Sequence, residues 1–479
     1  MRQLSGLDAS FLYFEMPNAP MHIGSVAIYD PSTAPGGKVR FKEIVANIGA
    51  RAHLIPSLTS RLVTVPMSAD HPYWVADGQY DPEFHIRHMA LPQPGDWRQL
   101  CILVSRLHAR PLDRNRPLWE AYVIEGLDNV EGYPKGCFAV YMKVHHAAID
   151  GASGVEMNTI VHDLSPVPER GDESQVFSVD TQPKNLELLI RAGMNKVKIP
   201  LKLATVLKNS GPGLAKAISG VATGRLKRIT DIPRTRFNRT VSSHRVFEGI
   251  RLDLSEVKAI KNAASPCTVN DVALAIVGGG LRRYLAAKKE LPTSSLVAMA
   301  PVNVRSKNKL GAGGNEVSQM TVSLSTDVEG GRARLMAVNE STRNAKELTN
   351  AVGAKSMTDY SQFIPPTLAH SAAKLASRAK LANRFSPIYN CVVTNVPGPP
   401  IPIFYTGAKM LCSYGTGPVL DSVGLFHAVS SYCNEFTIAF TACREMMPDP
   451  EFYKECLMAS LAELQELVGE QTDEVMAKP

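Results

Sequence analysis

The sequence of 479 residues lacks the patterns that commonly identify a secreted, membrane-spanning or metal-binding protein. It contains no uninterrupted apolar run long enough to cross a bilayer, and residues 1–5 lead directly into a patterned segment with no secretory apolar region. No C-x-x-C pair is present, which argues against a zinc site or a redox dithiol. We therefore expect a cytoplasmic protein that associates peripherally with a membrane. Its scattered cysteines are expected to be reduced and buried, and they are Cys101, Cys137, Cys267, Cys391, Cys412, Cys433, Cys443 and Cys456.

The charge of the chain is mildly basic and unevenly distributed. Hydrophobic residues make up 44% and charged residues 20% of the chain, which is typical of a globular protein. The net charge of +7 suits phosphate-bearing substrates or an anionic membrane and does not require nucleic acid. Residues 188–229 include nine basic and no acidic residues. This stretch is a solvated linker, a membrane-binding segment or a source of charge for substrate phosphates, and the sequence leaves all three open.

Strand-like and helix-like segments alternate along the chain, whose length predicts two or three domains. Residues 166–184 are rich in proline, serine, aspartate and glutamine, which is typical of a linker. The next segment predicts a helix with one apolar face, formed by Leu186, Leu189, Ile190, Met194 and Val197. Strands are expected at Ile23–Tyr29, Cys137–Val144, Leu296–Val304, Asn390–Thr394, Gly424–Tyr432 and Phe436–Cys443. Helices are expected at Phe41–Ala52, Leu100–Ala109, Val269–Tyr284 and Glu451–Val468. Mixed elements on both sides of the linker predict α/β or α+β domains.

The most informative pattern is His-His-Ala-Ala-Ile-Asp-Gly at residues 145–151. It follows a predicted strand, and loops at strand ends often carry reactive side chains. Successive side chains of an extended segment point to opposite faces, so we expect one of His145 and His146 to face a reaction site and the other to support it. Histidine can accept and return a proton near neutral pH. Asp150 can orient a histidine or anchor the loop, and Gly151 permits a backbone conformation that a Cβ would block.

Other interpretations of this pattern are weaker. A chance occurrence in a chain of this length has odds on the order of one in a thousand. A zinc site lacks third and fourth ligands at a familiar spacing. The sequence contains no G-x-S-x-G nucleophile elbow, phosphate-binding loop or dinucleotide fingerprint, and glycines 278–280 lie inside a helix-like run. The pattern therefore predicts direct transfer between two bound substrates, with no metal.

The stretch 145–151 resembles the HHxxxDG motif of CoA-dependent acyltransferases. The segments around it resemble those of the bacterial wax ester synthase/diacylglycerol acyltransferase family. The matches follow the order of the family's motifs and span nearly the whole chain. They comprise Leu4–Ser10 with Met21–Gly24, Arg116–Glu120 around Pro-Leu-Trp, Thr268–Val272 with Asn-Asp, Pro301–Arg305 and Thr394–Pro399.

The resemblance implies an α/β fold of the α+β sandwich type. Two chloramphenicol-acetyltransferase-like domains would be joined by a helical linker, with the active site at their interface. The expected domains are residues 1–175, which carry the histidine motif, a basic helical linker over 176–243, and residues 244–479. The resemblance further implies transfer of a long-chain acyl group from acyl-CoA to a fatty alcohol or a diacylglycerol. This reaction would take place at a membrane or lipid-droplet surface and would need no cofactor.

The same resemblance implies roles for single residues. His146 would deprotonate the acceptor hydroxyl in a ternary complex, with His145 beside it, and Asp150 and Gly151 would support the loop rather than polarise His146. Asn270 is the candidate donor to the oxyanion, and helix capping is its structural alternative. The remaining candidates bind substrate or shape the fold, and they are Pro117, Leu118, Trp119, Asp271, Asn303 and Arg305. Within this set, a tryptophan beside a proline is more typical of core packing than of a substrate contact.

Two other classes of protein share the motif or the fold. A peptide-synthetase-like condensation domain carries HHxxxDG and joins carrier-bound acyl groups to amines. Such domains have a DFGWG-like segment, where this chain has Asp421–Gly424 without tryptophan. A non-catalytic lipid-binding or droplet-coating protein would tolerate a broken histidine pair, which is intact here. Acyl transfer is therefore the favoured hypothesis, and the preferred acceptor stays open.

Overall fold

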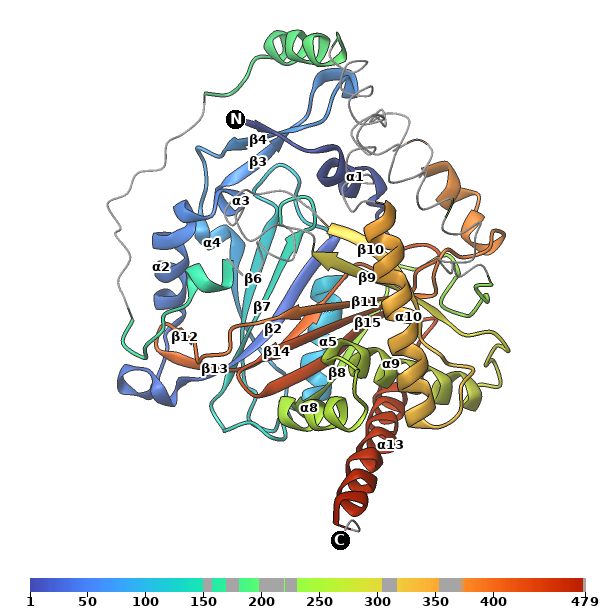
Figure 1. Ribbon diagram of the computed structural model, residues 1–479. Coiled ribbons are helices and arrows are strands. Elements are labelled where there is room, and N and C mark those ends of the chain that lie inside the picture. Colours follow the sequence, from blue (N-terminus) through green and yellow to red (C-terminus); the bar gives the residue numbers. More distant parts are fainter. Residues whose placement is uncertain are drawn as a thin grey trace.

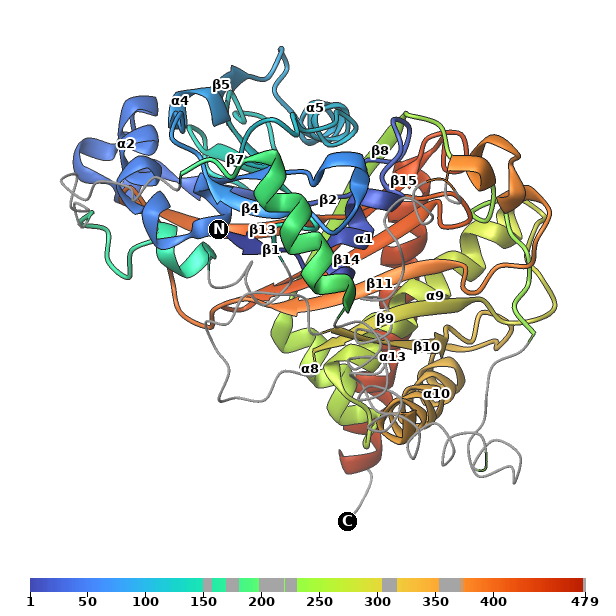
Figure 2. The ribbon, with the colours of Figure 1, turned by 90° about the horizontal axis from the view of Figure 1, so that it is seen from above.

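The computed structural model describes residues 1–149, 157–168, 181–197, 219, 231–303, 317–352, 371 and 374–476. Two six-stranded sheets and one three-stranded sheet form its framework, with helices packed against them (Figures 1 and 2). This arrangement is the expected mixed α/β fold. The domain boundaries 175/176 and 243/244 remain a prediction, and much of the segment at and between them (residues 169–180, 198–218 and 220–230) lies outside the described residues.

The first large sheet carries the histidine pair at the end of its central strand β7. Its order is β12 (Phe404–Tyr405), β13 (Ala408–Thr416), β2 (His22–Asp30), β7 (Phe138–His145), β6 (Trp119–Glu125) and β5 (Ile86–Ala90). Side chains alternate along β7, so Phe138 and Val140 face α2 (Phe41–Arg51), while Ala139 and Tyr141 face α5 (Trp97–His108). Strands β12 and β13 come from the C-terminal half of the chain, and no pattern in the sequence predicts that they join this sheet.

The second large sheet forms the core of the C-terminal half. Its order is β10 (Val317–Ser323), β9 (Val297–Asn303), β11 (Cys391–Pro397), β14 (Leu425–Tyr432), β15 (Glu435–Cys443) and β8 (Arg245–Asp253). The helices that pack on it and on one another are α8 (Leu254–Ala263), α9 (Val269–Ala287), α10 (Gly331–Val352) and α13 (Pro450–Met476). A Cβ at Gly278 would lie 2.2 Å from the carbonyl oxygen of Leu324, and one at Gly280 would lie 2.7 Å from the side chain of Leu457. Glycine therefore lets α9 approach both the sheet and α13 closely.

Shorter elements connect these layers. The third sheet has the order β1 (Arg2–Gln3), β4 (Tyr73–Ala76) and β3 (Ser60–Val63). The short helices of the N-terminal half are α1 (Gly6–Phe14), α3 (Pro56–Thr59) and α4 (Pro82–His85). Single 3-10 turns are η1 (Pro31–Thr33), η2 (Pro35–Gly37), η3 (Ala52–Leu54), η4 (Pro66–Ser68) and η6 (Leu381–Asn383). The strands and helices predicted from the sequence within the described residues are all present, with ends shifted by a few residues and α13 extended to Met476.

The predicted helix at the start of the basic stretch forms over residues 185–197, and most of its apolar face is not buried. Leu188 and Ala192 are buried against Val65, Tyr73 and Val75 beside the three-stranded sheet. Four residues apart, they form a narrow stripe that fits this small surface. The other apolar side chains are exposed, and they are Leu186, Ile190, Met194 and Val197. The structure therefore leaves an apolar face of this helix open to solvent.

The cysteines are free thiols, and all are buried except the half-buried Cys433. No helix in the described part of the chain combines the length and the apolar character needed to span a bilayer.

Three buried histidines make the stability of the fold depend on pH. Burial lowers the pKa of His108 from its ordinary value of 6.5 to about 3, and those of His162 and His427 to about 4. In the unfolded chain each of these side chains binds a proton as pH falls through about 6.5, whereas the folded protein keeps them neutral. Their contribution is fully present above pH 6.5 and is lost progressively as pH falls, down to about pH 4 for His162 and His427 and about pH 3 for His108.

The change His427→Gln tests this dependence. Nε2 of His427 lies 2.8 Å from the hydroxyl of Tyr453, so glutamine should lower the free energy of unfolding at pH 7 by about 1–2 kcal/mol. Because glutamine does not titrate, the free energy of unfolding of the variant should fall less steeply on acidification. At about pH 5.5 the variant should take up close to one proton fewer on unfolding than the parent. Urea unfolding at pH 7, 6 and 5 measures both effects. Equal slopes for the parent and the variant would contradict the assignment.

Candidate active site

The backbone of the histidine pair is held from both sides at the end of β7. The amide of His145 donates to the carbonyl oxygen of Leu118 at 2.9 Å, and the amide of His146 donates to that of Met21 at 2.8 Å. His145 also lies directly opposite His22 in the antiparallel β2–β7 pair. The position of both imidazoles is thus set by strand pairing on each side.

The two histidines have different surroundings. The amide of Ala147 donates to Nδ1 of His145 at 3.0 Å, so in the neutral ring the proton is on Nε2. The side chain of His145 is 1% exposed, and its Nε2 lies 3.5 Å from Oε2 of Glu15. His146 is half-buried and stacks on Phe11 of α1, with ring centroids 3.9 Å apart. His145 therefore faces a buried polar cluster, whereas His146 occupies the more accessible position.

Glu15, directly after α1, is the centre of this cluster. Its Oε1 accepts the amide proton of Met21 at 3.1 Å and lies 3.5 Å from Nε2 of His22. Its Oε2 accepts from Nε of Arg114 at 3.0 Å and faces His145. Burial by itself would raise the pKa of Glu15, but the hydrogen bond and charge of His145, together with Arg114, hold this pKa well below its usual value. The carboxylate is therefore ionised at neutral pH.

Two further buried groups near the strand end are Lys143 and His22. Lys143 donates to the carbonyl oxygens of Leu107 and Arg110 at 3.0 and 2.8 Å, and its Nζ lies 3.1 Å from Oε2 of Glu120. These contacts connect the end of α5 to β7. The pKa of His22 lies well below its ordinary value, because burial and the nearby charge of Lys143 disfavour a second cation.

The Pro-Leu-Trp motif shapes this region from within the core. Pro117, Leu118 and Trp119 are all buried. The indole N–H of Trp119 donates to the carbonyl oxygen of Leu58 at 2.8 Å, and its ring stacks on His85 with centroids 4.6 Å apart. The carbonyl of Leu118 is the acceptor for His145 described above. The motif thus contacts the histidine pair through its backbone.

The Asn-Asp motif lies in the first turn of α9. Thr268 is the N-cap, and the carboxylate of Asp271 accepts from the amide and the hydroxyl of Thr268 at 2.8 and 2.7 Å. This is a capping box, so capping is performed by Thr268 and Asp271 rather than by Asn270. Oδ1 of Asn270 instead accepts from Nδ2 of Asn395 at 3.3 Å, which joins two of the motifs singled out in the sequence.

The remaining candidates are less completely placed. Asn303 is the last residue of β9, opposite Val317. Asp150, Gly151 and Arg305 lie outside the described residues. No group of three or more metal-ligating side chains in a coordinating arrangement occurs within the described part of the chain.

Sequence reasoning missed Glu15, Phe11 and Arg114. Glu15 lies between two of the segments that carry the family resemblance, which is the only signal that pointed to it. Its partners Arg114 and His145 are 99 and 130 residues further along the chain, so no local spacing pattern links them.

Comparison with known proteins identifies the family. The family model for the wax ester synthase/diacylglycerol acyltransferase catalytic domain matches residues 4–273. The chain belongs to this family. It is an acyltransferase, and the model for the family's C-terminal domain matches its residues 313–465.

Relatives and solved structures agree with this assignment. The acyltransferase is 31% identical over 470 residues to a Mycobacterium tuberculosis protein named as a diacylglycerol O-acyltransferase, with 96% of this chain and 91% of the relative covered. A second protein of that organism, also named as a diacylglycerol O-acyltransferase, is 30% identical over 465 residues, with 96% of this chain and 98% of the relative covered. The solved structure of the wax ester synthase/diacylglycerol acyltransferase from Marinobacter aquaeolei VT8 has a TM-score of 0.68 and 26% identity, and covers 98% of this chain and 100% of that one.

A more distant likeness concerns the fold alone. The starter condensation domain of rhizomide synthetase has a TM-score of 0.57 at 12% identity, covering 98% of this chain and 95% of that one.

The change Glu15→Gln tests whether the buried carboxylate positions the histidine pair. We expect kcat to fall about 10- to 100-fold, the cost of a slightly displaced catalytic group, while KM for both substrates changes little. Because the pKa of Glu15 is lowered on folding, its stabilising contribution is present above its ordinary value of 4.5 and is lost as pH falls below it. The stability difference between parent and variant should therefore shrink from pH 7 to pH 4.

A matched control is Glu435→Gln, which removes another partly buried carboxylate, paired with Arg251 by two hydrogen bonds. Steady-state kinetics and urea unfolding of both variants give the comparison. A Glu15→Gln protein with the kcat of the parent, or a control with the same loss, would contradict a positioning role.

Proposed function

We propose that this acyltransferase moves a long-chain acyl group from acyl-CoA to a fatty alcohol or a diacylglycerol, with His146 as general base. The observation that carries the proposal is the contrast between the two histidines of the motif. His145 is enclosed, with Nδ1 bonded to a backbone amide and Nε2 facing Glu15. His146 is the half-buried one, held by Met21 at its backbone and by Phe11 at its ring.

In the proposed reaction both substrates are bound together. His146 takes the proton of the acceptor hydroxyl, and the oxygen attacks the thioester carbonyl carbon. The C–S bond of the tetrahedral intermediate then breaks, and protonated His146 returns its proton to the leaving thiolate. Holding the two substrates in line supplies much of the rate advantage, and the scheme needs neither cofactor nor metal.

The oxyanion of the intermediate needs a donor, for which we propose Asn270. The side-chain oxygen of Asn270 accepts a hydrogen bond from Asn395. The NH₂ group of Asn270 is not used in this bond, and it is the end of the side chain that can donate to an oxyanion. Asp150 and Gly151 are proposed to support the loop after His146. Asn303 and Arg305 are proposed to bind substrate or to shape the site from the C-terminal half.

Several buried cysteines are poor candidates for a covalent nucleophile. Burial raises the pKa of Cys391 to about 12 and those of Cys267 and Cys456 to about 11. Thiols with raised pKa values are poor nucleophiles at neutral pH. They are suited to packing in the core.

The change His146→Ala tests the assignment of the base. We expect turnover to fall by about 10²- to 10⁴-fold with little effect on melting temperature, because a half-buried ring is lost rather than a core contact. Thiol release from palmitoyl-CoA is measured with hexadecanol, dioleoylglycerol or a long-chain amine as acceptor. His145→Ala should lose less activity per folded molecule but more stability, since that ring is enclosed. Parental turnover in a folded His146→Ala protein would remove His146 from the mechanism.

The acceptors in this assay also separate the alternative functions. Release that depends on a hydroxyl acceptor supports the proposal and ranks alcohol against diacylglycerol. Release only with the amine would favour a condensation-type reaction. Absence of release from folded protein with every acceptor would favour a lipid-binding role.

We also propose that the helix at residues 185–197 attaches the enzyme to an anionic membrane or lipid-droplet surface. It lies at the periphery of the molecule (the green helix at the top of Figure 1). Ile190 and Met194 are each 56% exposed, and Leu186 and Val197 are more exposed still. The sequence from residue 188 to 229 carries nine basic and no acidic residues. An exposed apolar face beside concentrated positive charge suits the interface of an anionic bilayer, where the insoluble acceptor is found.

The double change Ile190→Glu/Met194→Glu tests this attachment. Two carboxylates on the exposed face should reduce binding to phosphatidylglycerol vesicles by about tenfold or more. Each removes an apolar side chain that would be buried in the membrane and adds a negative charge that the anionic surface repels. The fold should be retained, because both side chains point to solvent. Vesicle co-sedimentation at low and high salt gives the measurement. The control Leu164→Glu/Val167→Glu places the same charges at other exposed apolar positions, 69% and 70% exposed. Equal binding by both variants would leave only the linker role.

A further inference from the structure

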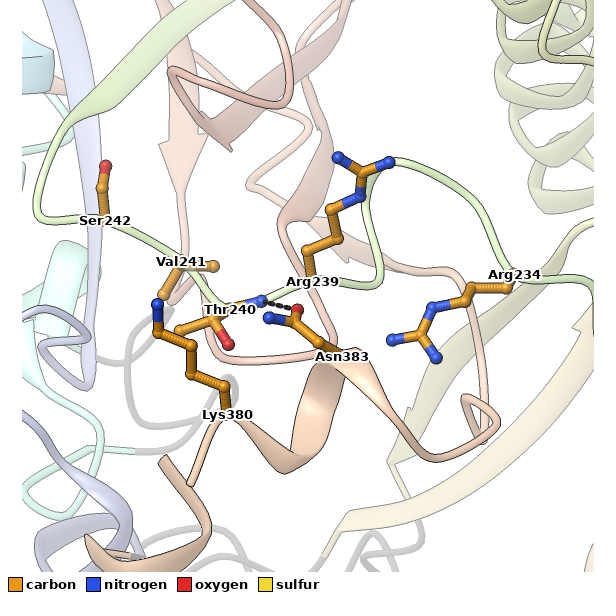
Figure 3. A pocket seen from close by; sticks show the side chains of 7 residues that line it. All are labelled: Arg234, Arg239, Thr240, Val241, Ser242, Lys380 and Asn383. Atoms are coloured by element: carbon orange, nitrogen blue, oxygen red, sulfur yellow. Dashed lines mark hydrogen bonds between the residues drawn. The ribbon is translucent and has the colours of Figure 1, made fainter. Parts of the chain in front are cut away.

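A pocket lined by positive charge lies between the segment before β8 and the turn η6 (Figure 3). It has a volume of about 710 Å³. Its lining includes three cations and no carboxylate, and consists of Arg234, Arg239, Thr240, Val241, Ser242, Lys380 and Asn383. A concave surface with charge of one sign concentrates anionic ligands.

The three cations have different tasks. The guanidinium of Arg234 donates to the carbonyl oxygens of Phe385 and Asn238, each at 3.2 Å, and so holds the two walls of the pocket together. Arg239 and Lys380 are exposed, and neither forms an ion pair with any described residue. These two side chains are available to a ligand.

Carboxylates near the pocket already have partners. Glu290 is paired with Arg236 at 2.7 Å, and the charge of Arg239 contributes to the lowered pKa of Glu290. Asp421 accepts the amide proton of Val241 at 2.9 Å. The positive charge of Arg239 and Lys380 is therefore not neutralised by a close contact.

One buried polar group of the pocket lacks a hydrogen-bond partner in the described part of the chain. The hydroxyl oxygen of Thr240 is buried and forms no hydrogen bond within the described residues. Its backbone amide, by contrast, donates to Oδ1 of Asn383 at 2.9 Å, which fixes Thr240 in the wall (dashed line in Figure 3). A buried hydroxyl without a partner costs free energy, which a ligand that accepts its proton would relieve.

The pocket is connected to the histidine site by hydrogen bonds. The carbonyl oxygen of Val241 accepts from Nδ2 of Asn18 at 2.9 Å, and Nη2 of Arg245 donates to the carbonyl oxygen of Asn18. Asn18 belongs to the short segment between Glu15 and Met21, the two residues that hold the histidine pair. The cationic wall and the histidine loop thus form one continuous structure.

We propose that this pocket binds the phosphate groups of acyl-CoA, with Arg239 and Lys380 as the binding cations and the Thr240 hydroxyl as a hydrogen-bond donor. The proposal rests on acyl-CoA as the donor in the proposed function. Phosphate oxygens accept several charge-assisted hydrogen bonds, which matches two cations and a hydroxyl. The pantetheine arm separates the phosphates of CoA from its thioester, so a phosphate site is expected beside the histidine loop rather than within it.

The double change Arg239→Gln/Lys380→Gln tests the site through binding of CoA itself, measured by calorimetry on the full chain. We expect the Kd for CoA to rise about tenfold, because two charge-assisted contacts become neutral ones, and the KM for palmitoyl-CoA to rise with it. Thr240→Val should raise the Kd by a smaller factor without changing charge. The control Lys38→Gln/Lys42→Gln removes two exposed lysines near α2 and should bind CoA as the parent does.

Further arms of the experiment identify the source of the phosphate. Dephospho-CoA, inorganic phosphate and phosphatidylglycerol vesicles are titrated against the same variants. A Kd for CoA that does not change in the double variant overturns the proposal, as does a loss confined to vesicle binding, which would assign the pocket to lipid headgroups. Binding requires no turnover, so the inactive His146→Ala protein should bind CoA normally. Failure of the catalytic proposal is thereby distinguishable from failure of this one.

Discussion

The site depends on the way the last residue of β7 is paired on both edges. On one side His145 lies opposite His22, and on the other its amide donates to the carbonyl oxygen of Leu118. A slip of one residue in this register would exchange the faces of His145 and His146 and move the accessible ring into the core. The segment that begins at Met21, the Pro-Leu-Trp motif and the histidine pair are thus joined by backbone hydrogen bonds. The Pro-Leu-Trp motif contributes to the site mainly through the carbonyl group of Leu118, which accepts the amide proton of His145.

Glu15 turns this backbone arrangement into a defined electrostatic site. A buried carboxylate is costly unless charges and donors surround it, and here Arg114 and the amide of Met21 do so. Met21 donates its amide proton to Glu15 and accepts the amide proton of His146 at its carbonyl oxygen, so one residue links the carboxylate to the accessible histidine. The positions of both histidines are therefore coupled to a single charge.

Much of the framework could be predicted from local patterns. Apolar composition predicted β2, alternating apolar residues predicted β7, and a long apolar segment predicted the helix α9, which is largely buried. Partners distant in sequence could not be predicted: β13 carries its own alternation, but nothing in it specifies β2, nearly 400 residues earlier. For a related reason, the sequence did not show which side of the helix at residues 185–197 is buried. Apolar periodicity does not reveal that the available partner surface accommodates only Leu188 and Ala192.

The two halves of the chain are too closely joined to act as separate modules. Strand β13 completes the sheet that carries the histidines, and the indole of Trp97 donates to the carboxylate of Glu248 on β8. Asn18 then connects the histidine loop to the wall at Val241. If one half holds the proton-transfer group while the other holds the donor's phosphates, binding energy from the distant phosphates can orient the thioester at the reacting centre. In the proposed direct transfer no bond to the enzyme holds the acyl group while the acceptor attacks, so we expect the bound phosphates to supply this orientation.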